Sequence, residues 1–212
     1  MNTSKSLTFY TADTPNGQKI SIFLKEAGID CERVKFNLSE GRQHSAEFLQ
    51  INPNGKIPAI VDHEAGVSVF ESAAILGYLS EKYDCLRAES PAEQLTVQQW
   101  LFFQVGAIGP MLGQLWWFLH GSKTSNEEAI TRYRKESLRI YGVVDGQLAK
   151  HAYLASNNYS IADVAAFPWL RTHEELNLDI TPFSHVRRWL EVIEARPAVK
   201  AGLADSREAS AS

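Results

Sequence analysis

Residues 54–61 read Asn-Gly-Lys-Ile-Pro-Ala-Ile-Val, and residues 67–72 follow after a short hinge as Val-Ser-Val-Phe-Glu-Ser. The apolar runs in these segments predict two half-buried strands. Pro58 opens the first strand without an N–H donor, so we expect a sharp turn there. A cis bond between Ile57 and Pro58 is a separate expectation, which the local sequence alone does not establish. A cis bond would turn the amide and carbonyl of Ile57 outward, toward an extended peptide. The stretch therefore predicts an edge that receives a peptide-like ligand.

The second strand leads into a helix whose start predicts a site for an amino-acid head group. Ile75, Leu76 and Leu79 recur at helical spacing, which makes Ser72 the expected N-cap. Free N–H groups and the helix dipole favour a carboxylate there, and Glu71 offers an acceptor for an ammonium. A carboxylate and an ammonium are the head of an amino acid, so a small peptide is the expected ligand.

The segment 54–72 as a whole resembles the glutathione site of the glutathione transferases. This resemblance implies a cis Pro58 and a γ-glutamyl group bound by Glu71 and Ser72. It also implies the glutathione transferase fold, in which an α/β thioredoxin-like domain precedes an all-α helical bundle. Glutathione would then serve as a substrate or cosubstrate.

The order of expected elements agrees with two domains. Before residue 84 we expect a strand at 7–12, a helix ending at Gly28, a strand at 32–38, a short helix within 39–51, and the two strands and helix of 54–83. This βαβαββα order is typical of a thioredoxin-like domain, here 6–83. Residues 84–91 are the expected linker, and 92–212 the expected helical C-terminal domain.

Within 92–212, helical periods predict helices at 92–120, 126–151, 161–176 and 183–195, with a last one after Pro197. The tail 203–212 is small and polar, so we expect it to fray. Ser160 and Asp163 form a Ser-x-x-Asp capping box, which we interpret as a folding device. The same box is found at this point of glutathione transferases, so the resemblance extends over nearly the whole chain.

Composition excludes several classes of protein. The 212 residues carry a net charge of −4, and the balance is even, with 8 basic against 10 acidic residues in 1–83. That distribution does not predict a nucleic-acid surface. No apolar run could span a bilayer and no signal peptide is evident, so we expect a soluble cytoplasmic protein. The six histidines show no metal-ligand spacing, and no metal site is expected.

The two cysteines give no sign of a redox pair. Cys31 and Cys85 lie far apart without a Cys-x-x-Cys motif, which argues against a disulfide scaffold and against a dithiol active site. Cys31 is expected to be a small buried residue. Any redox sulfur must then come from the ligand.

Residues 14–20, Thr-Pro-Asn-Gly-x-Lys-Ile, and 23–28, Phe-Leu-x-Glu-Ala-Gly, resemble the Nu class of bacterial glutathione transferases. That class acts as glutathione-dependent disulfide-bond oxidoreductases. The resemblance implies that Thr14 and Asn16 lie beside the glutathione sulfur and that no catalytic cysteine is used. From the residues alone, the alternative is that Thr14 only caps the first helix.

Further matches to this class include Gln43 after Glu-Gly-Arg, and Arg132, which by resemblance helps to hold glutathione. Lys56 and Gln43 could reach the glycine carboxylate of the ligand. The alternative for Lys56 and Arg132 is that each is a solvated surface charge that does not contact the ligand. Trp116 and Trp117 depart from the class, because we expect more polar residues there. They could line a pocket for a second substrate or pack helix against helix.

These observations together predict a homodimeric, glutathione-dependent disulfide-bond oxidoreductase that reduces small disulfides with glutathione as thiol donor. One alternative is a glutathione S-transferase or glutathione-dependent lyase acting on aromatic electrophiles. A second alternative is a non-catalytic glutathione-binding interaction module. The expected partners are glutathione or its disulfide and a small second substrate, without nucleic acid or membrane.

Overall fold

The computed structural model describes residues 5–207, and these residues form two units. Residues up to 85 belong together with those from 196 onward, and residues 86–195 form the other unit. The boundary between residues 85 and 86 falls inside the segment 84–91 that was expected to be a linker.

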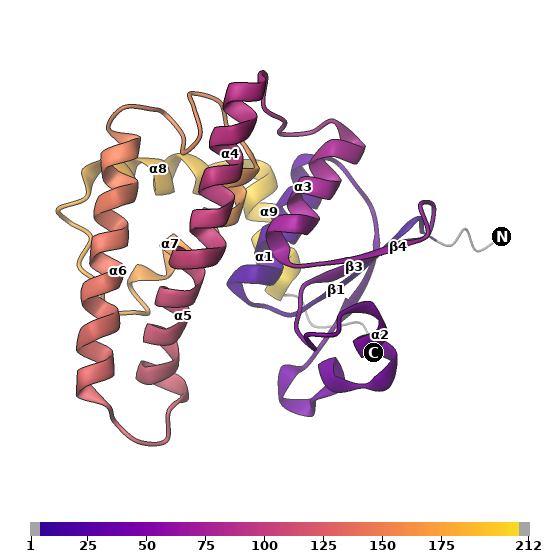
Figure 1. Ribbon diagram of the computed structural model, residues 1–212, viewed down its shortest axis with the longest axis horizontal. Helices are drawn as coiled ribbons and strands as arrows, with labels where there is room; N and C mark the ends of the chain where they lie inside the picture. The colour runs from indigo at the N-terminus through magenta and orange to yellow at the C-terminus, as the bar shows by residue number, and fades with distance from the viewer. Residues whose placement is uncertain (1–4, 208–212) are drawn as a thin grey trace. The chain divides into compact units, whose positions relative to one another are not determined.

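A four-stranded mixed sheet is the centre of the first unit, in the order β2-β1-β3-β4 (Figure 1). The strands are β1 (Leu7–Thr11), β2 (Glu32–Lys35), β3 (Ala59–Asp62) and β4 (Val67–Phe70). The helical segments of this part are α1 (Pro15–Glu26), η1 (Leu38–Glu40), η2 (Arg42–His44), α2 (Ala46–Ile51) and α3 (Ser72–Tyr83). β1 pairs parallel with β2 and antiparallel with β3, and β4 is antiparallel to β3. The expected thioredoxin-like order is confirmed.

The core of this unit follows from the alternation in the strands and the apolar face of α1. Phe9 and Ile60 face each other across β1 and β3, and both are fully buried with Ile20 and Phe23 of α1. A smaller cluster joins Phe36, Phe48 and Ala59, with Tyr10 packed against it. Both clusters include residues of β1 and β3, so they anchor the strands from which the loops after β1 and before β3 extend.

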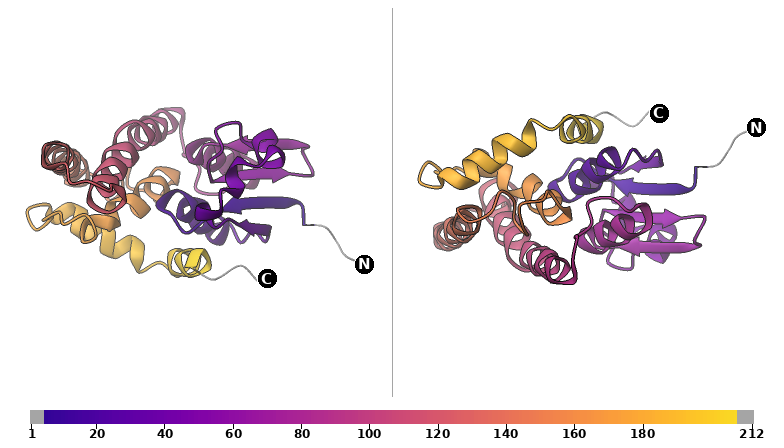
Figure 2. Two further views of the ribbon diagram at one scale, coloured as in Figure 1. Left: turned by 90° about the horizontal axis from the view of Figure 1, so that it is seen from below. Right: turned by 90° about the horizontal axis from the view of Figure 1, so that it is seen from above.

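The last helix, α9 (Pro197–Arg207), packs along α1, although the two are far apart in the sequence (Figure 1; Figure 2). Leu203 and Ser206 are buried, and Asp205 pairs with Lys25 and Arg33 at 2.7 and 2.8 Å. The expectation of a fraying tail is therefore wrong for residues 203–207, and 208–212 lie outside the described residues. The helix also departs from the expected domain of 92–212, because it packs in the first unit.

The second unit contains a helical segment where we expected one helix at 92–120. It consists of α4 (Pro91–Phe103), a π-helical turn η3 (Gln104–Ile108), α5 (Gly109–Trp116) and a second π-helical turn η4 (Trp117–Gly121). Pro110 explains the first interruption, because it lacks an N–H and its ring crowds the carbonyl of Gly106 one turn earlier. The helical path continues through both turns (Figure 1).

The remaining helices of this unit are α6 (Glu127–Leu148), α7 (Ile161–Leu170), η5 (Arg171–His173) and α8 (Ser184–Glu194). The helix expected at 161–176 is shorter, because the chain tightens into η5 and then turns at Asn177, which has a φ of 52°.

The capping box of Ser160 and Asp163 is formed at the start of α7. Asp163 is fully buried and accepts hydrogen bonds from the N–H groups of Ser160 and Leu154 and from Trp189 Nε1. Burial raises the pKa of Asp163 to about 6, although these donors favour its anion. This one carboxylate therefore ties α7 to the preceding loop and to α8.

Residues 5–207 contain neither a helix that could span a membrane nor a cluster of possible metal ligands. Within that range, no helix combines the length and apolar character that a membrane crossing requires. In the same range, no three His, Cys, Asp or Glu side chains gather closely enough to hold a metal ion.

Candidate functional site

The register of the sheet brings three predicted segments to one end of the sheet. Tyr10 lies opposite Ala59, so the chain leaving β1 runs beside the chain entering β3. Ala59 also lies opposite Phe70, so the chain leaving β4 runs on the other side of that entry. The segments that hold Thr14, Ile57 and Ser72 therefore meet at one end of the sheet.

The loop before β3 is held by side-chain bonds to its backbone. The Ile57–Pro58 bond is cis, as predicted. Asn52 Nδ2 donates to the carbonyl of Lys56 at 2.6 Å, and Asn52 Oδ1 accepts from the N–H of Asn54 at 2.9 Å. These bonds fix the backbone that leads into Ile57, while the side chain of Lys56 stays exposed.

Gln43 lies on the turn that packs against this loop. A β-carbon at Gly55 would lie 2.8 Å from His44 Nδ1 and 3.2 Å from the Gln43 carbonyl oxygen, so only glycine fits there. Gln43 Nε2 donates to the carbonyl of Leu38 at 3.2 Å, while its buried Oε1 has no hydrogen-bond partner among residues 5–207. The turn thus brings Gln43 into the neighbourhood of Lys56.

The junction of β4 and α3 differs from the expectation in one respect. Glu71, with φ of 68° and ψ of 118°, occupies the N-cap position, and Ser72 is the first helical residue. The prediction that Ser72 is the N-cap is therefore wrong, because the backbone turns into the helix at Glu71, one residue earlier. A non-glycine residue at positive φ is strained, and such residues gather at functional sites. Glu71 remains exposed and Ser72 is buried.

Lys19, which the sequence analysis assigned no role, lies behind this junction. Its side chain is 1% exposed, and its Nζ donates to Ser72 Oγ at 3.0 Å. Burial lowers the pKa of Lys19 to about 7, and the negative charge of Glu71 opposes that shift. The burial of Lys19 could have been predicted from the sequence, because Lys19 lies four residues before Phe23 and therefore on the apolar face of α1.

The start of α1 carries Thr14 and Asn16. Thr14 is the N-cap, and its Oγ1 accepts from the N–H of Gly17 at 3.2 Å. Because Oγ1 acts there as acceptor, this bond leaves the hydroxyl hydrogen to be donated elsewhere. Gly17 permits the close turn, since a β-carbon there would lie 2.2 Å from the carbonyl oxygen of Ala12. Thr14 and Asn16 are both half-buried, at the positive end of the helix dipole.

The predicted residues Arg132, Trp116 and Trp117 lie in the other unit, as do Ser160 and Asp163 of the capping box. Arg132 is exposed on α6. Trp116 and Trp117 are 41% and 47% exposed, and Trp116 Nε1 donates to Glu175 Oε1 at 2.6 Å. Trp117 packs edge-on against Phe118. Neither indole is buried, so neither belongs to the core of its unit.

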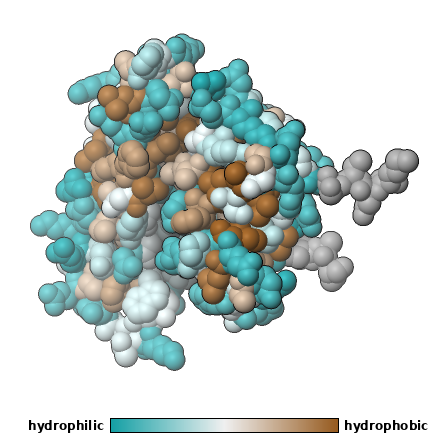
Figure 3. Space-filling view, turned by 45° about the vertical axis from the view of Figure 1, so that its right-hand side comes forward, coloured by the Kyte–Doolittle hydropathy of each residue, from teal (hydrophilic) through white to brown (hydrophobic). Residues whose placement is uncertain are grey.

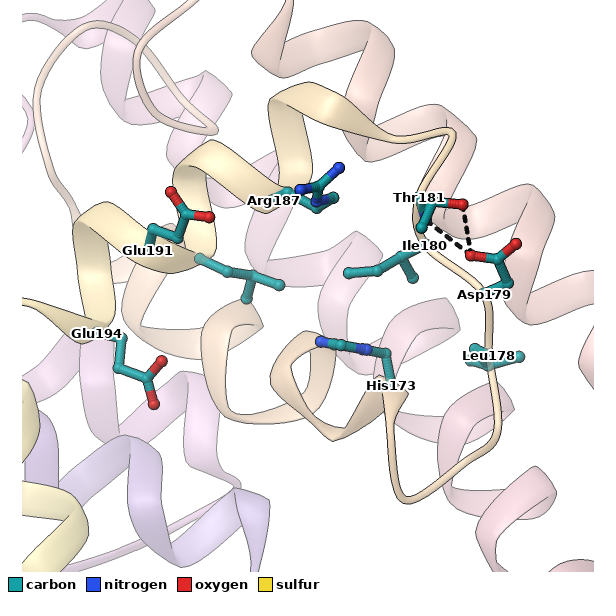
Figure 4. Close-up of a pocket in the computed structure, with 9 residues that line it drawn as sticks. His173, Leu178, Asp179, Ile180, Thr181, Arg187, Glu191 and Glu194 are labelled. Carbon is teal, nitrogen blue, oxygen red and sulfur yellow. Dashed lines mark hydrogen bonds between the residues drawn. The ribbon is translucent and has the colours of Figure 1, made fainter.

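The helical unit also has a cavity of about 370 Å³ beside α8 (Figure 4). Its lining includes His173, Ile180, Arg187 and Glu191, and none of the predicted site residues. In Figure 4 the imidazole of His173 points inward toward Ile180. Burial lowers the pKa of His173, which favours a neutral ring.

Comparison with known families identifies this architecture. The family model for the glutathione S-transferase N-terminal domain matches residues 5–81, and that for the C-terminal domain matches 108–197. The chain belongs to the glutathione S-transferase family. The expected fold, a thioredoxin-like domain followed by a helical domain, is thereby confirmed.

Among characterised relatives of this glutathione S-transferase is the disulfide-bond oxidoreductase YfcG of Escherichia coli, 42% identical over 96% of this chain and 100% of that protein. A second is the disulfide-bond oxidoreductase YghU of the same organism, 36% identical over 92% of this chain and 73% of that protein. Both are similar along both domains of the chain.

Solved structures of similar glutathione transferases contain the tripeptide. One from Pseudomonas putida, with one glutathione disulfide per subunit, has a TM-score of 0.89 and 39% identity and covers 96% of this chain and 93% of its own. A homologue from Lodderomyces elongisporus, with two glutathione molecules per subunit, has a TM-score of 0.90 and 34% identity and covers 95% and 99%.

Proposed function

We propose that this glutathione S-transferase binds glutathione and reduces small disulfides with it. The observation that carries the proposal is the meeting of the Thr14, Ile57 and Ser72 segments at one end of the sheet. In the proposed complex, the backbone of Ile57 pairs with the cysteinyl residue of glutathione, Glu71 accepts from its ammonium, and the first turn of α3 with Ser72 holds its α-carboxylate. The similarity to YfcG and YghU supports the disulfide chemistry.

The proposed roles at the outer end of the tripeptide belong to Gln43, Lys56 and Arg132. Gln43 and Lys56 lie on neighbouring turns, which suits binding of the glycine carboxylate. Arg132 is exposed on α6, and we propose that it contributes a further positive charge to glutathione.

The sulfur chemistry requires a thiolate. A free thiol with a pKa of about 8.5 is mostly protonated at neutral pH, so the protein must stabilise the anion. In the proposal, Thr14 donates its hydroxyl hydrogen to the sulfur, and Asn16 and the dipole of α1 assist it. Two exchanges follow: the thiolate attacks the disulfide and expels one thiolate, and a second glutathione attacks the mixed disulfide. Two glutathione molecules and one disulfide thus become glutathione disulfide and two thiols.

The protein's own cysteines are poorly suited to this role. Cys31 is 4% exposed, and burial raises the pKa of its thiol. Burial also raises the pKa of Cys85, and the charges of Glu26 and Asp84 add to that effect. Neither thiol is activated, which supports a mechanism in which glutathione supplies all the sulfur.

A conjugating transferase is the second candidate, favoured by the exposed indoles of Trp116 and Trp117, which could contact an aromatic electrophile.

The two activities are separated by measuring glutathione-driven reduction of hydroxyethyl disulfide beside conjugation to a chloronitrobenzene. We expect disulfide reduction to dominate and to fall about tenfold or more in Thr14→Ala, since a hydrogen bond to a charged group is lost. Thr96→Ala, at a half-buried position on α4, is the matched control. Dominant conjugation would favour the transferase, and neither activity a non-catalytic binding module.

We further propose that the enzyme is a cytoplasmic homodimer of the Nu class. The segment 14–20 supports the class, and the free cysteines Cys31 and Cys85 suit a reducing compartment. Apolar patches interrupt the surface (Figure 3), and on α4 Leu95 and Phe102, one heptad apart, are 58% and 71% exposed. We expect light scattering to give twice the chain mass for the wild type, and the single mass for Phe102→Asp but not for Val143→Asp.

A further inference from the structure

A buried amine lies directly behind the junction that the proposed function assigns to the γ-glutamyl group. Lys19 projects from the second turn of α1, and its Nζ lies 3.0 Å from Ser72 Oγ at the first residue of α3. The side chain is 1% exposed, and Ile20 and Phe23 of the same helix are fully buried. A lysine in such a place is costly, because its charge is taken out of water.

The donor and acceptor properties of the two groups fix the direction of their hydrogen bond. An ammonium has three donors and no acceptor, so Ser72 Oγ must accept from a charged Lys19. The hydroxyl hydrogen of Ser72 must then be donated to another atom. A neutral amine could instead accept that hydrogen, and the hydroxyl would turn inward.

We propose that Lys19 is a positioning residue, which aims the hydroxyl hydrogen of Ser72 at the α-carboxylate of the γ-glutamyl group and places a positive charge behind it. This inference rests on the proposed function, because it assumes glutathione at the Glu71–Ser72 junction. Lys19 does not touch the ligand and acts through Ser72. Its charge adds to the dipole of α3, which already favours an anion at that place.

The charged groups around Lys19 are consistent with this role. Glu71, at the start of α3, is the acidic group whose charge acts on Lys19. Asp205 of α9, which also packs against α1, pairs with Lys25, and Arg196, just before α9, pairs with Glu26; both pairs lie at the far end of α1. At the near end, Asp13 accepts from Gln18 Nε2 at 2.9 Å. When the ammonium of the ligand engages Glu71, the carboxylate of the ligand supplies a new negative charge near Lys19.

The consequence is a coupling between binding and protonation. With a pKa of about 7, the amine of Lys19 is mostly neutral at pH 8 in the free protein. A bound carboxylate favours the charged form, so binding takes up a proton, approaching about one at pH 8 and falling toward none below pH 6. The affinity should therefore decrease as the pH rises from 6 to 8.5.

The test uses S-methylglutathione, whose sulfur cannot ionise, titrated calorimetrically into the wild type and Lys19→Met in buffers of different ionisation enthalpy. The amine of the ligand contributes equally to both proteins, so the difference in proton uptake belongs to Lys19. We expect an extra uptake of about 0.5 proton or more at pH 8 in the wild type, and about tenfold weaker binding by Lys19→Met at pH 6.5. Lys200→Met, which removes an exposed lysine of α9, should behave as the wild type.

Stability separates this role from a structural one. Methionine matches lysine in shape and removes a buried charge, so Lys19→Met should unfold at the same or a higher urea concentration. Because Lys19 also acts through its charge, the double variant Lys19→Met, Ser72→Ala should bind more weakly than Ser72→Ala alone, but by less than the loss that Lys19→Met causes when Ser72 is present. The inference is overturned if Lys19→Met binds with wild-type affinity and wild-type proton uptake, or if it weakens binding only by unfolding. Failure of the wild type to bind S-methylglutathione would instead overturn the proposed function.

Discussion

Gly202 of α9 approaches the backbone of Ile22 in α1 so closely that a β-carbon at position 202 would lie 2.6 Å from the Ile22 Cα. Backbone atoms cannot move aside as a flexible side chain can. The two helices therefore depend on a glycine at their crossing.

Gly202→Ala should lower the free energy of unfolding by about 1–3 kcal/mol, because the two helices must separate to admit the methyl group. Gly146→Ala on α6 is the matched control, since a β-carbon there meets nothing within 4 Å. That control should be neutral or stabilising by up to about 1 kcal/mol. Urea unfolding of both variants checks the prediction, and equal effects of the two would contradict the close crossing.

Asp62 predicts how the first unit responds to acid. Burial alone would raise the pKa of this carboxylate, but hydrogen bonds from Lys82 at 2.5 Å, from Tyr78 at 2.7 Å and from the N–H of Ala65 lower it to about 2. Its folded pKa lies below its unfolded value, so its contribution is present above about pH 4 and is lost as the pH falls toward 2. Asp62→Asn should destabilise the neutral protein by about 1–2 kcal/mol and flatten the acid dependence. Glu64→Gln, at an exposed position, is the control, and an unchanged slope in Asp62→Asn would refute the assignment.

The double variant Cys31→Ser, Cys85→Ser tests whether glutathione supplies all the sulfur. We expect its kcat for hydroxyethyl disulfide to stay within about twofold of the wild type, because neither thiol is activated. Since serine at the buried position 31 can reduce stability, circular dichroism and a Cys31→Ala variant control for folding. A folded but inactive double variant would rule out the proposed sulfur chemistry.

Asp163 predicts the stability of the helical unit. In Asp163→Ala, the N–H of Leu154 and Trp189 Nε1 lose their acceptor in a buried place, so unfolding should become easier by about 3 kcal/mol or more. Asp179→Ala removes an exposed carboxylate that bonds its neighbour Thr181, and it should cost less than about 1 kcal/mol. Chemical denaturation followed by tryptophan fluorescence distinguishes the two, and similar losses would contradict the role of Asp163.

The sequence predicted the features that local chemistry determines. Pro58 marked the strand entry, and the Ser-x-x-Asp spacing marked the start of α7, whereas the cis bond was expected only with the family resemblance added to the local sequence. The order of strands and helices along the first domain followed from alternation and turn residues. The candidate site at the end of the sheet could be predicted, because the segments that form it are strand ends and helix starts, which local sequence marks.

The features that the sequence analysis missed depend on contacts between distant segments. Lys19 and Ser72 are 53 residues apart, and only the packing of α1 against α3 brings them together. The tail after Leu203 seemed too small and polar to pack, but a close helix crossing requires small residues such as Gly202. Pro110 was a local signal for the π-helical interruption that the periodicity of 92–120 concealed.

The return of α9 to α1 has a consequence for the order of synthesis. Ile22 is translated before the helical unit, whereas the helix that covers it is translated after that unit. Until then, the sheet domain remains one helix short, and the entire helical unit must emerge before it is completed.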